Sequence, residues 1–129
     1  MKTIKEYIEA VQSLVPATRT STTNGTGVDT QGYTQACALI TVGDIDTASG
    51  NETYVFSVEE SADNSTFTAV SGLTATVTAD NDVKYIEIPG VGTDRERYLR
   101  VVATLGGTTP SVAGGAAILL GGAFQNPTN

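Results

Sequence analysis

Histidine and tryptophan are absent from this chain of 129 residues, and cysteine occurs once. Without histidine the chain lacks the commonest general base, the usual serine triad and most kinds of zinc site. The single Cys37 cannot form an internal disulfide, and its place in the apolar run ACALITV predicts a buried small side chain rather than a reactive thiol. We therefore expect no enzyme activity, no metal ion and no cofactor.

Positive charge is also scarce. Seven Lys and Arg residues face 14 Asp and Glu residues, which gives a net charge of −7, and the basic residues form no patch. Phosphate groups would be repelled, so we expect no binding to nucleic acid. The start, MKTIKEYIEAVQSLVPA, has charges among its apolar residues, unlike a signal peptide, and no later run predicts a membrane span. We expect synthesis in a reducing cytoplasm and no membrane contact.

The first fifteen residues have the pattern of a short amphipathic helix. Thr3 and Glu6 have the spacing of a capping box, and Pro16 would end the helix because it lacks an amide hydrogen. The apolar residues recur at helical spacing, at Ile4, Tyr7, Ile8, Val11 and Val15. Residues 16–32 are rich in Thr, Gly and Asn, which predicts an extended linker or arm with little core of its own.

From residue 33 onward, short runs of alternating apolar and polar residues are separated by turn residues. This pattern predicts one β-sandwich domain over residues 33–129, with antiparallel sheets. The strands are expected at residues 36–42, 53–60, 66–70, 73–79, 83–88, 97–105 and 116–122. The last run, AAILLGG, is apolar at nearly every position, which predicts a central strand or a strand that a partner covers.

The segment VEESADNSTFTAV, residues 58–70, is the densest group of carboxylates. Calcium needs six to eight oxygen ligands, and the segment lacks the ligand spacing of a calcium-binding helix-loop-helix. Glu59 and Glu60 are adjacent on a predicted strand, so their side chains point to opposite faces and cannot act on one glycosidic bond. Asp63 and Asn64 suit the turn of a hairpin. We interpret this segment as a hairpin rather than an ion site or an acid/base pair.

An ordered series of segments resembles a family of small head proteins of tailed bacteriophages, the capsid decoration or cement proteins. The segments are VQSLVPATRT, NGTGVDTQGY, VEESADNSTFTAV, RYLRVVAT and GAAILLGGAFQNP, which together span nearly the whole chain. The resemblance implies an all-β, jelly-roll-like domain preceded by the short helix and arm. It also implies a dimeric or trimeric homo-oligomer that binds the major capsid protein on the outer surface of the virion. The family has no active-site residues to transfer.

The N-terminal segment is the candidate for partner binding. A helix of about twelve residues is marginal alone, so its apolar side chains need a surface to cover. We hypothesise that residues 1–30 reach a capsid subunit or a sister copy and become ordered on binding. The candidate contact residues are Ile4, Tyr7, Ile8, Val11 and Arg19.

Two other functions fit the same pattern. A glycan-binding β-sandwich on the virion would share the strands, although such proteins normally present aromatic platforms and this chain has no tryptophan. A component of the tail or of the head-tail connector would use a similar small β-domain. A connector would form rings of fixed stoichiometry, whereas a cement protein would bind assembled shells.

Overall fold

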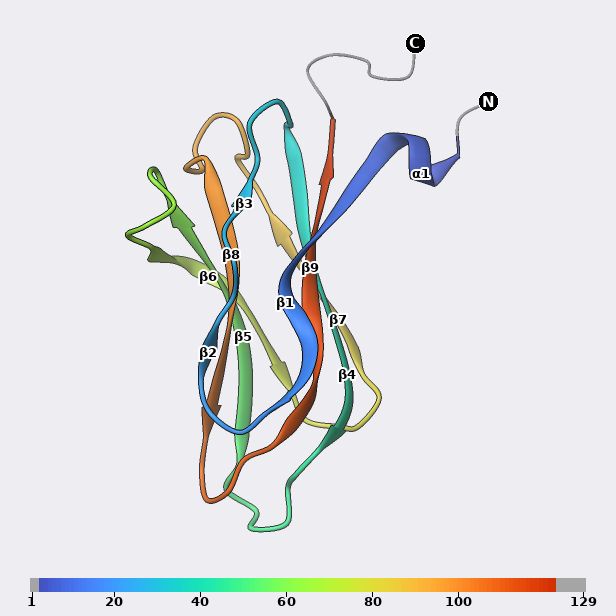
Figure 1. Cartoon of the computed structure of the whole chain (residues 1–129), viewed down its shortest axis with the longest axis vertical. Helices are drawn as coiled ribbons and strands as arrows, with labels where there is room; N and C mark the ends of the chain where they lie inside the picture. Colours follow the sequence, from blue (N-terminus) through green and yellow to red (C-terminus); the bar gives the residue numbers. More distant parts are fainter. Residues whose placement is uncertain (1–2, 123–129) are drawn as a thin grey trace.

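A computed structural model describes residues 3–122, and these residues form an almost entirely β structure with antiparallel strands (Figure 1). One short helix precedes nine strands. In chain order the elements are α1 (Ile4–Tyr7), β1 (Ile8–Arg19), β2 (Thr23–Asn24), β3 (Val28–Asp29), β4 (Gln35–Ile45), β5 (Thr53–Ser61), β6 (Thr68–Val77), β7 (Val83–Ile88), β8 (Tyr98–Gly106) and β9 (Val112–Gly121). No helix within residues 3–122 is long and apolar enough to cross a bilayer.

The strands form two sheets, which Figure 1 shows as two layers. Sheet I has the order β1-β9-β4-β7, and sheet II has the order β2-β8-β5-β6 with β3 also paired to β8. Every pairing is antiparallel. Alternation along the strands explains this arrangement, because every second side chain of β5 points into the space between the sheets. The predicted all-β, antiparallel class is confirmed.

The core lies between the two sheets and takes side chains from both. Its most completely buried members include Leu14, Ile40, Ile118 and Leu120 from sheet I and Tyr54, Val58, Leu99 and Val101 from sheet II. Removing each large apolar side chain from water is worth about 1.5–3 kcal/mol, so these rows supply most of the stability. The Tyr54 hydroxyl is satisfied inside the core, where it accepts a hydrogen bond from the Ser111 amide at 2.9 Å.

The helix predicted for residues 1–15 is wrong over most of its length. Only Ile4–Tyr7 are helical, and Ile8–Arg19 form β1 at the edge of sheet I, paired with β9. Pairing with β9 satisfies the backbone, whereas a short isolated helix is marginal in water. Pro16 lies where the pairing register shifts between Leu14 and Ala17, which is a position that tolerates the missing amide hydrogen. The pairing of residues 8–19 with the distant β9 therefore overrides the helical spacing of their apolar residues.

Residues 16–32 are extended, as predicted, but they are tied to both sheets. The end of β1 belongs to sheet I, whereas β2 and β3 pair with β8 in sheet II. Val28 is buried, which gives this segment a place in the core. The two strands predicted at residues 66–70 and 73–79 are one strand, β6, whose pairing with β5 is interrupted by a bulge.

The Ser13 hydroxyl joins the two sheets where the chain crosses between them. Its oxygen accepts a hydrogen bond from the Val101 amide at 2.9 Å and donates one to the Thr26 carbonyl at 2.8 Å. Gly25 lies against this point, because a Cβ atom there would be 2.4 Å from both the Ser13 hydroxyl and the Val101 carbonyl oxygen. The close contact of residue 25 with Ser13 and Val101 therefore requires glycine.

Candidate protein-binding surface

Exposed apolar side chains gather on one side of the molecule. Among the described residues, every large hydrophobic side chain that is strongly exposed lies on α1 or sheet I, and none lies on sheet II. They are Ile4 (76% exposed), Tyr7 (60%), Ile8 (40%), Val15 (60%), Val83 (50%) and Tyr85 (65%). Large apolar side chains left exposed on one side of a protein are typical of surfaces that bind other proteins.

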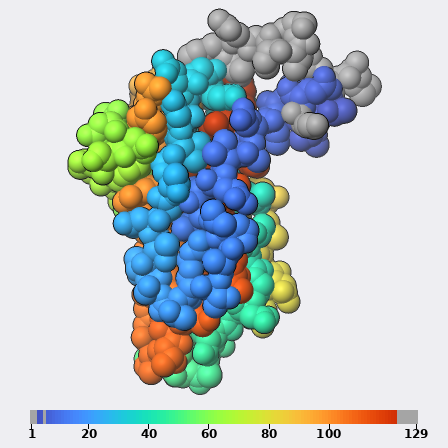
Figure 2. Space-filling view, viewed as in Figure 1, coloured from blue at the N-terminus to red at the C-terminus, as the bar shows by residue number. Residues whose placement is uncertain are grey.

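The first part of this surface is the N-terminal projection, residues 3–8, which extends away from the upper end of sheet I (Figures 1 and 2). The Thr3 amide donates to the Glu6 carboxylate at 2.9 Å, so the predicted capping contact between these residues is present. Next to the projection, the Tyr33 hydroxyl donates to the Glu9 carboxylate at 2.7 Å. This bond raises the pKa of Tyr33, because the carboxylate stabilises the protonated phenol. The projection is therefore anchored at its root.

The second part is the outer face of sheet I. Cys37 lies opposite Leu119 in the pairing of β4 with β9, and Leu39 lies opposite Tyr85 in the pairing of β4 with β7. Their neighbours along the strands, such as Ala38 and Ile118, point into the core and are fully buried. The outer face of sheet I therefore carries several apolar side chains beside polar residues such as Glu87.

A hollow of about 700 Å³ takes its lining from strands of sheet I and from β6 of sheet II. Its lining includes Ile8, Cys37, Leu73, Glu87, Pro89 and Leu119. Cys37 is half-buried here rather than placed in the core as the sequence predicted. Burial raises the pKa of its thiol, and the negative charge of Glu87 raises it further. The hollow combines apolar side chains with the polar Thr34 and Gln35 and with the carboxylate of Glu87.

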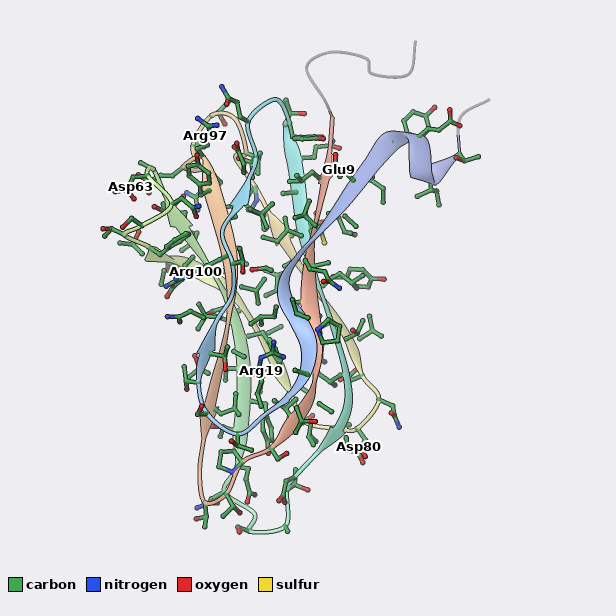
Figure 3. The ribbon with its side chains drawn as sticks, in the orientation of Figure 1. Glu9, Arg19, Asp63, Asp80, Arg97 and Arg100 are labelled. Atoms are coloured by element: carbon green, nitrogen blue, oxygen red, sulfur yellow. The ribbon has the colours of Figure 1, made fainter. Side chains whose placement is uncertain are left out.

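The structure brings together three of the five residues predicted for partner binding. Ile4, Tyr7 and Ile8 all lie on the N-terminal projection, whereas Val11 is half-buried against the core. Arg19 lies at the far end of β1, as Figure 3 shows relative to Glu9. Its guanidinium donates to the Gly114 carbonyl at 2.8 Å, so it ties β1 to β9.

The turn between β5 and β6 confirms the hairpin interpretation. The Asp63 carboxylate accepts hydrogen bonds from the amides of Ser65 at 2.9 Å and Thr66 at 3.0 Å. The Thr66 amide first, and then the Ser61 hydroxyl, hold the pKa of Asp63 below its usual range. Asn64 adopts a positive φ of 60°. The Asp63 carboxylate therefore serves the turn itself.

Sequence reasoning missed the ion pairs beside this turn. Arg100 donates to Glu59 at 2.6 and 2.9 Å, and its guanidinium lies 4.1 Å from the centre of the Phe67 ring. Arg95 lies 3.5 Å from Glu60. Nothing in the local sequence around Arg95 and Arg100 shows which carboxylates another strand will bring beside them. These pairs neutralise one another and leave no convergent reactive group.

Within residues 3–122, no three Cys, Asp or Glu residues lie close enough to hold a metal ion together. The apolar surface of the projection and of sheet I is thus the candidate functional site. Comparison of the chain with models of protein families gave no match, and no curated protein sequence matched it.

Proposed function

We propose that this protein is a structural component of a bacteriophage virion that binds the outer surface of the capsid and stabilises the shell by bridging subunits of the major capsid protein. The observation that carries the proposal is the gathering of exposed apolar side chains on the N-terminal projection and the outer face of sheet I. A surface of this kind suits contact with protein subunits rather than catalysis. The resemblance of the chain to decoration proteins supports the same function.

The finer fold that we propose is a jelly-roll β-sandwich. With β2 and β3 taken as one strand, eight strands form two sheets in the orders β1-β9-β4-β7 and β2-β8-β5-β6. The strand order supports an eight-stranded jelly roll, because the chain passes repeatedly from one sheet to the other, as two Greek keys require. Jelly rolls serve as viral capsid domains and as lectins, so the fold alone does not choose between these functions.

The charge favours the outside of the shell. A protein with a net charge of −7 would be repelled by packaged DNA. On the outer surface the same charge needs to complement only local patches of the capsid.

One observation supports glycan binding as a second candidate. Tyr85 is 65% exposed on the outer face of sheet I and could stack on a sugar ring. No single contact favours a tail or head-tail connector component. A connector would assemble into rings by itself, and a glycan-binding protein would keep its binding in the absence of shells.

The test is co-sedimentation of the protein with expanded shells that lack it. We expect saturable binding at a fixed ratio to the major capsid protein, together with a higher melting temperature of the shell. No binding to shells, with the protein found only at the tail or the vertex of virions, would overturn the proposal in favour of the connector or receptor-binding function.

The structure also sets the boundary of a useful deletion. β1 begins at Ile8, so deletion of residues 1–15 would remove about two thirds of the 12-residue β1 and expose the edge of β9. Deletion of residues 1–7 removes the exposed side chains of Ile4 and Tyr7 and leaves the pairing of β1 with β9 in place. We expect this deletion to lower shell occupancy without changing the far-ultraviolet circular dichroism, whereas a Thr74→Ala control on sheet II should match the wild type. Full occupancy by the deleted chain would exclude a role for the projection.

A further inference from the structure

We propose that a pocket beside Arg97, at the upper end of the molecule in Figure 3, binds the carboxylate group of a small polar molecule, either a free organic acid or an acidic sugar residue. The pocket has a volume of about 270 Å³ and is called the arginine pocket below. Residues 30–33 form one side of its lining, and Gly92, Arg95 and Arg97 form the other. It shares no residue with the exposed apolar side chains described above, so the inference does not depend on capsid binding.

Arg95 supplies hydrogen-bond donors that the fold does not use. Its side chain is only 21% exposed, and its Nε atom is buried without a hydrogen-bond acceptor among residues 3–122. The Glu60 Oε1 atom lies 3.5 Å from this Nε atom and already accepts a hydrogen bond from the Glu96 amide at 2.9 Å. Burying a charged donor without an acceptor is costly, because the donor has lost water and gained no replacement. An oxyanion in the pocket would offer the guanidinium the acceptors that it lacks.

Arg97 is fixed beside Arg95 by bonds from both its side chain and its backbone. Its Nε and Nη2 atoms donate to the two carboxylate oxygens of Asp29, each at 2.8 Å. These bonds use two of the five N–H groups of the guanidinium, and three remain for a ligand. The Arg97 carbonyl accepts from the Thr30 amide at 2.9 Å and from the Thr30 hydroxyl at 2.6 Å. The two sides of the pocket are therefore joined before a ligand arrives, and binding orders little of the protein.

Tyr33 gives the arginine pocket a fixed aromatic wall. Its side chain packs against the core, and its hydroxyl donates to Glu9 at 2.7 Å. The amide side chain of Gln31 adds a neutral polar group to the same lining. Apolar surface beside a few polar groups suits an organic molecule better than a bare ion. The volume lies just below the range of about 300–1,000 Å³ for drug-sized ligands, so it suits one small acid or one sugar residue.

The charges around the pocket favour a carboxylate over a phosphate. The lining residues include no acidic side chain, although the whole chain carries a net charge of −7. Asp29 and Glu60 lie beside the two arginines and offset most of their positive charge. A site with many donors and little net charge suits a singly charged group, whose two oxygens match the fork of a guanidinium. A phosphate dianion or a polyanion would be repelled more strongly by the acidic chain.

Titration of the isotope-labelled protein, followed by amide chemical shifts in nuclear magnetic resonance spectra, tests the site. The probes are acetate, methyl glucuronide and the neutral methyl glucoside, at one pH and one ionic strength. We expect the two carboxylates to cause saturable shifts at residues 30–33 and 92–97, and the glucoside to bind at least about tenfold more weakly. Tighter binding of the glucuronide than of acetate would identify an acidic sugar as the ligand, whereas equal affinities would identify a free acid; either result supports the site.

Two arginine variants and a matched control complete the test. Arg95→Gln and, separately, Arg97→Gln should each raise the dissociation constant of the carboxylates by about tenfold, with unchanged far-ultraviolet circular dichroism. The control Lys84→Gln removes the same charge from β7, outside the pocket, and should bind like the wild type. The inference would be overturned by the absence of saturable shifts, by equal affinity for the glucoside, by tighter binding of inorganic phosphate, or by equal weakening in the control. Shell co-sedimentation reports separately on the proposed function.

Discussion

Replacement of Ser13 by alanine tests how the two sheets are joined. The Ser13 side chain is buried with 3% exposure, and its hydroxyl holds one hydrogen bond to Val101 of β8 and one to Thr26. The Val101 carbonyl accepts from the Gly25 amide on the same side of β8, so the Val101 amide faces Ser13 and not β5. The substitution therefore removes the partner of a buried amide.

The magnitude follows from these two bonds. An unsatisfied buried amide costs about 1–3 kcal/mol, and the lost bond to the Thr26 carbonyl adds about 0.5–1.5 kcal/mol. Gly25 packs closely against Ser13, so loss of the hydroxyl oxygen leaves too little room for a water molecule to replace it. Alanine keeps the Cβ atom, so no steric change contributes. We expect the free energy of unfolding to fall by about 1.5–4.5 kcal/mol.

Equilibrium unfolding in urea measures this change, and the slope of free energy against denaturant should stay constant if the native fold is kept. The control is Ser71→Ala, which removes an exposed hydroxyl on β6 and should change stability by less than about 0.5 kcal/mol. Equal stability of the two variants would refute the assignment of Ser13 as the link between the sheets.

Three further predictions concern charge and packing. Ala substitutions at Arg100 and Glu59, combined in a double-mutant cycle, should give a coupling of about 1 kcal/mol that salt weakens only slightly, because both side chains are largely buried. No coupling would contradict the pairing. The folded structure lowers the pKa of Asp63, so the ionised carboxylate stabilises the fold above the unfolded pKa of about 3.9. This stabilisation is lost as the pH falls through the pKa of Asp63 in the folded state. The stability difference between wild type and Asp63→Asn should therefore close in acid, and a constant difference would contradict this. Gly114→Ala places a Cβ atom 2.3 Å from a backbone oxygen and should lower the free energy of unfolding by about 1–3 kcal/mol. The control is Gly43→Ala, where the nearest neighbour of the new Cβ atom lies at 3.9 Å, and this variant should melt like the wild type. Equal melting temperatures of the two variants would contradict the close packing at Gly114.

Most of the strands could be predicted because their side chains alternate between core and solvent. β5 and β7 begin and end within a residue of their predicted limits. β9 lies between β1 and β4, as predicted for a central strand from its continuous apolar run. β2 and β3, at two residues each, are too short to produce a pattern. β1 was missed because its apolar residues also fit helical spacing, and only the distant β9 decides between the two conformations.

The sequence predicted only part of the candidate protein-binding surface. The exposed residues of the projection were predicted, although as part of a longer helix. The outer face of sheet I was predicted only in part, because AAILLGG alone was interpreted as a central strand or a strand that a partner covers. The runs ACALITV and AAILLGG indicate a covered outer face, because strands that lack apolar/polar alternation are expected to be covered on both faces.

The hypothesis that the N-terminal segment reaches a sister copy changes how a deletion on the shell must be interpreted. A dimer that binds the shell at two points gains avidity, because its second contact is made at a high effective concentration. Loss of residues 1–7 would then weaken shell binding even if those residues never touched the capsid. Covalent linkage of two deleted copies distinguishes the two explanations. The linked pair should recover shell occupancy if the projection acts through the dimer, and it should not recover if the projection contacts the capsid itself.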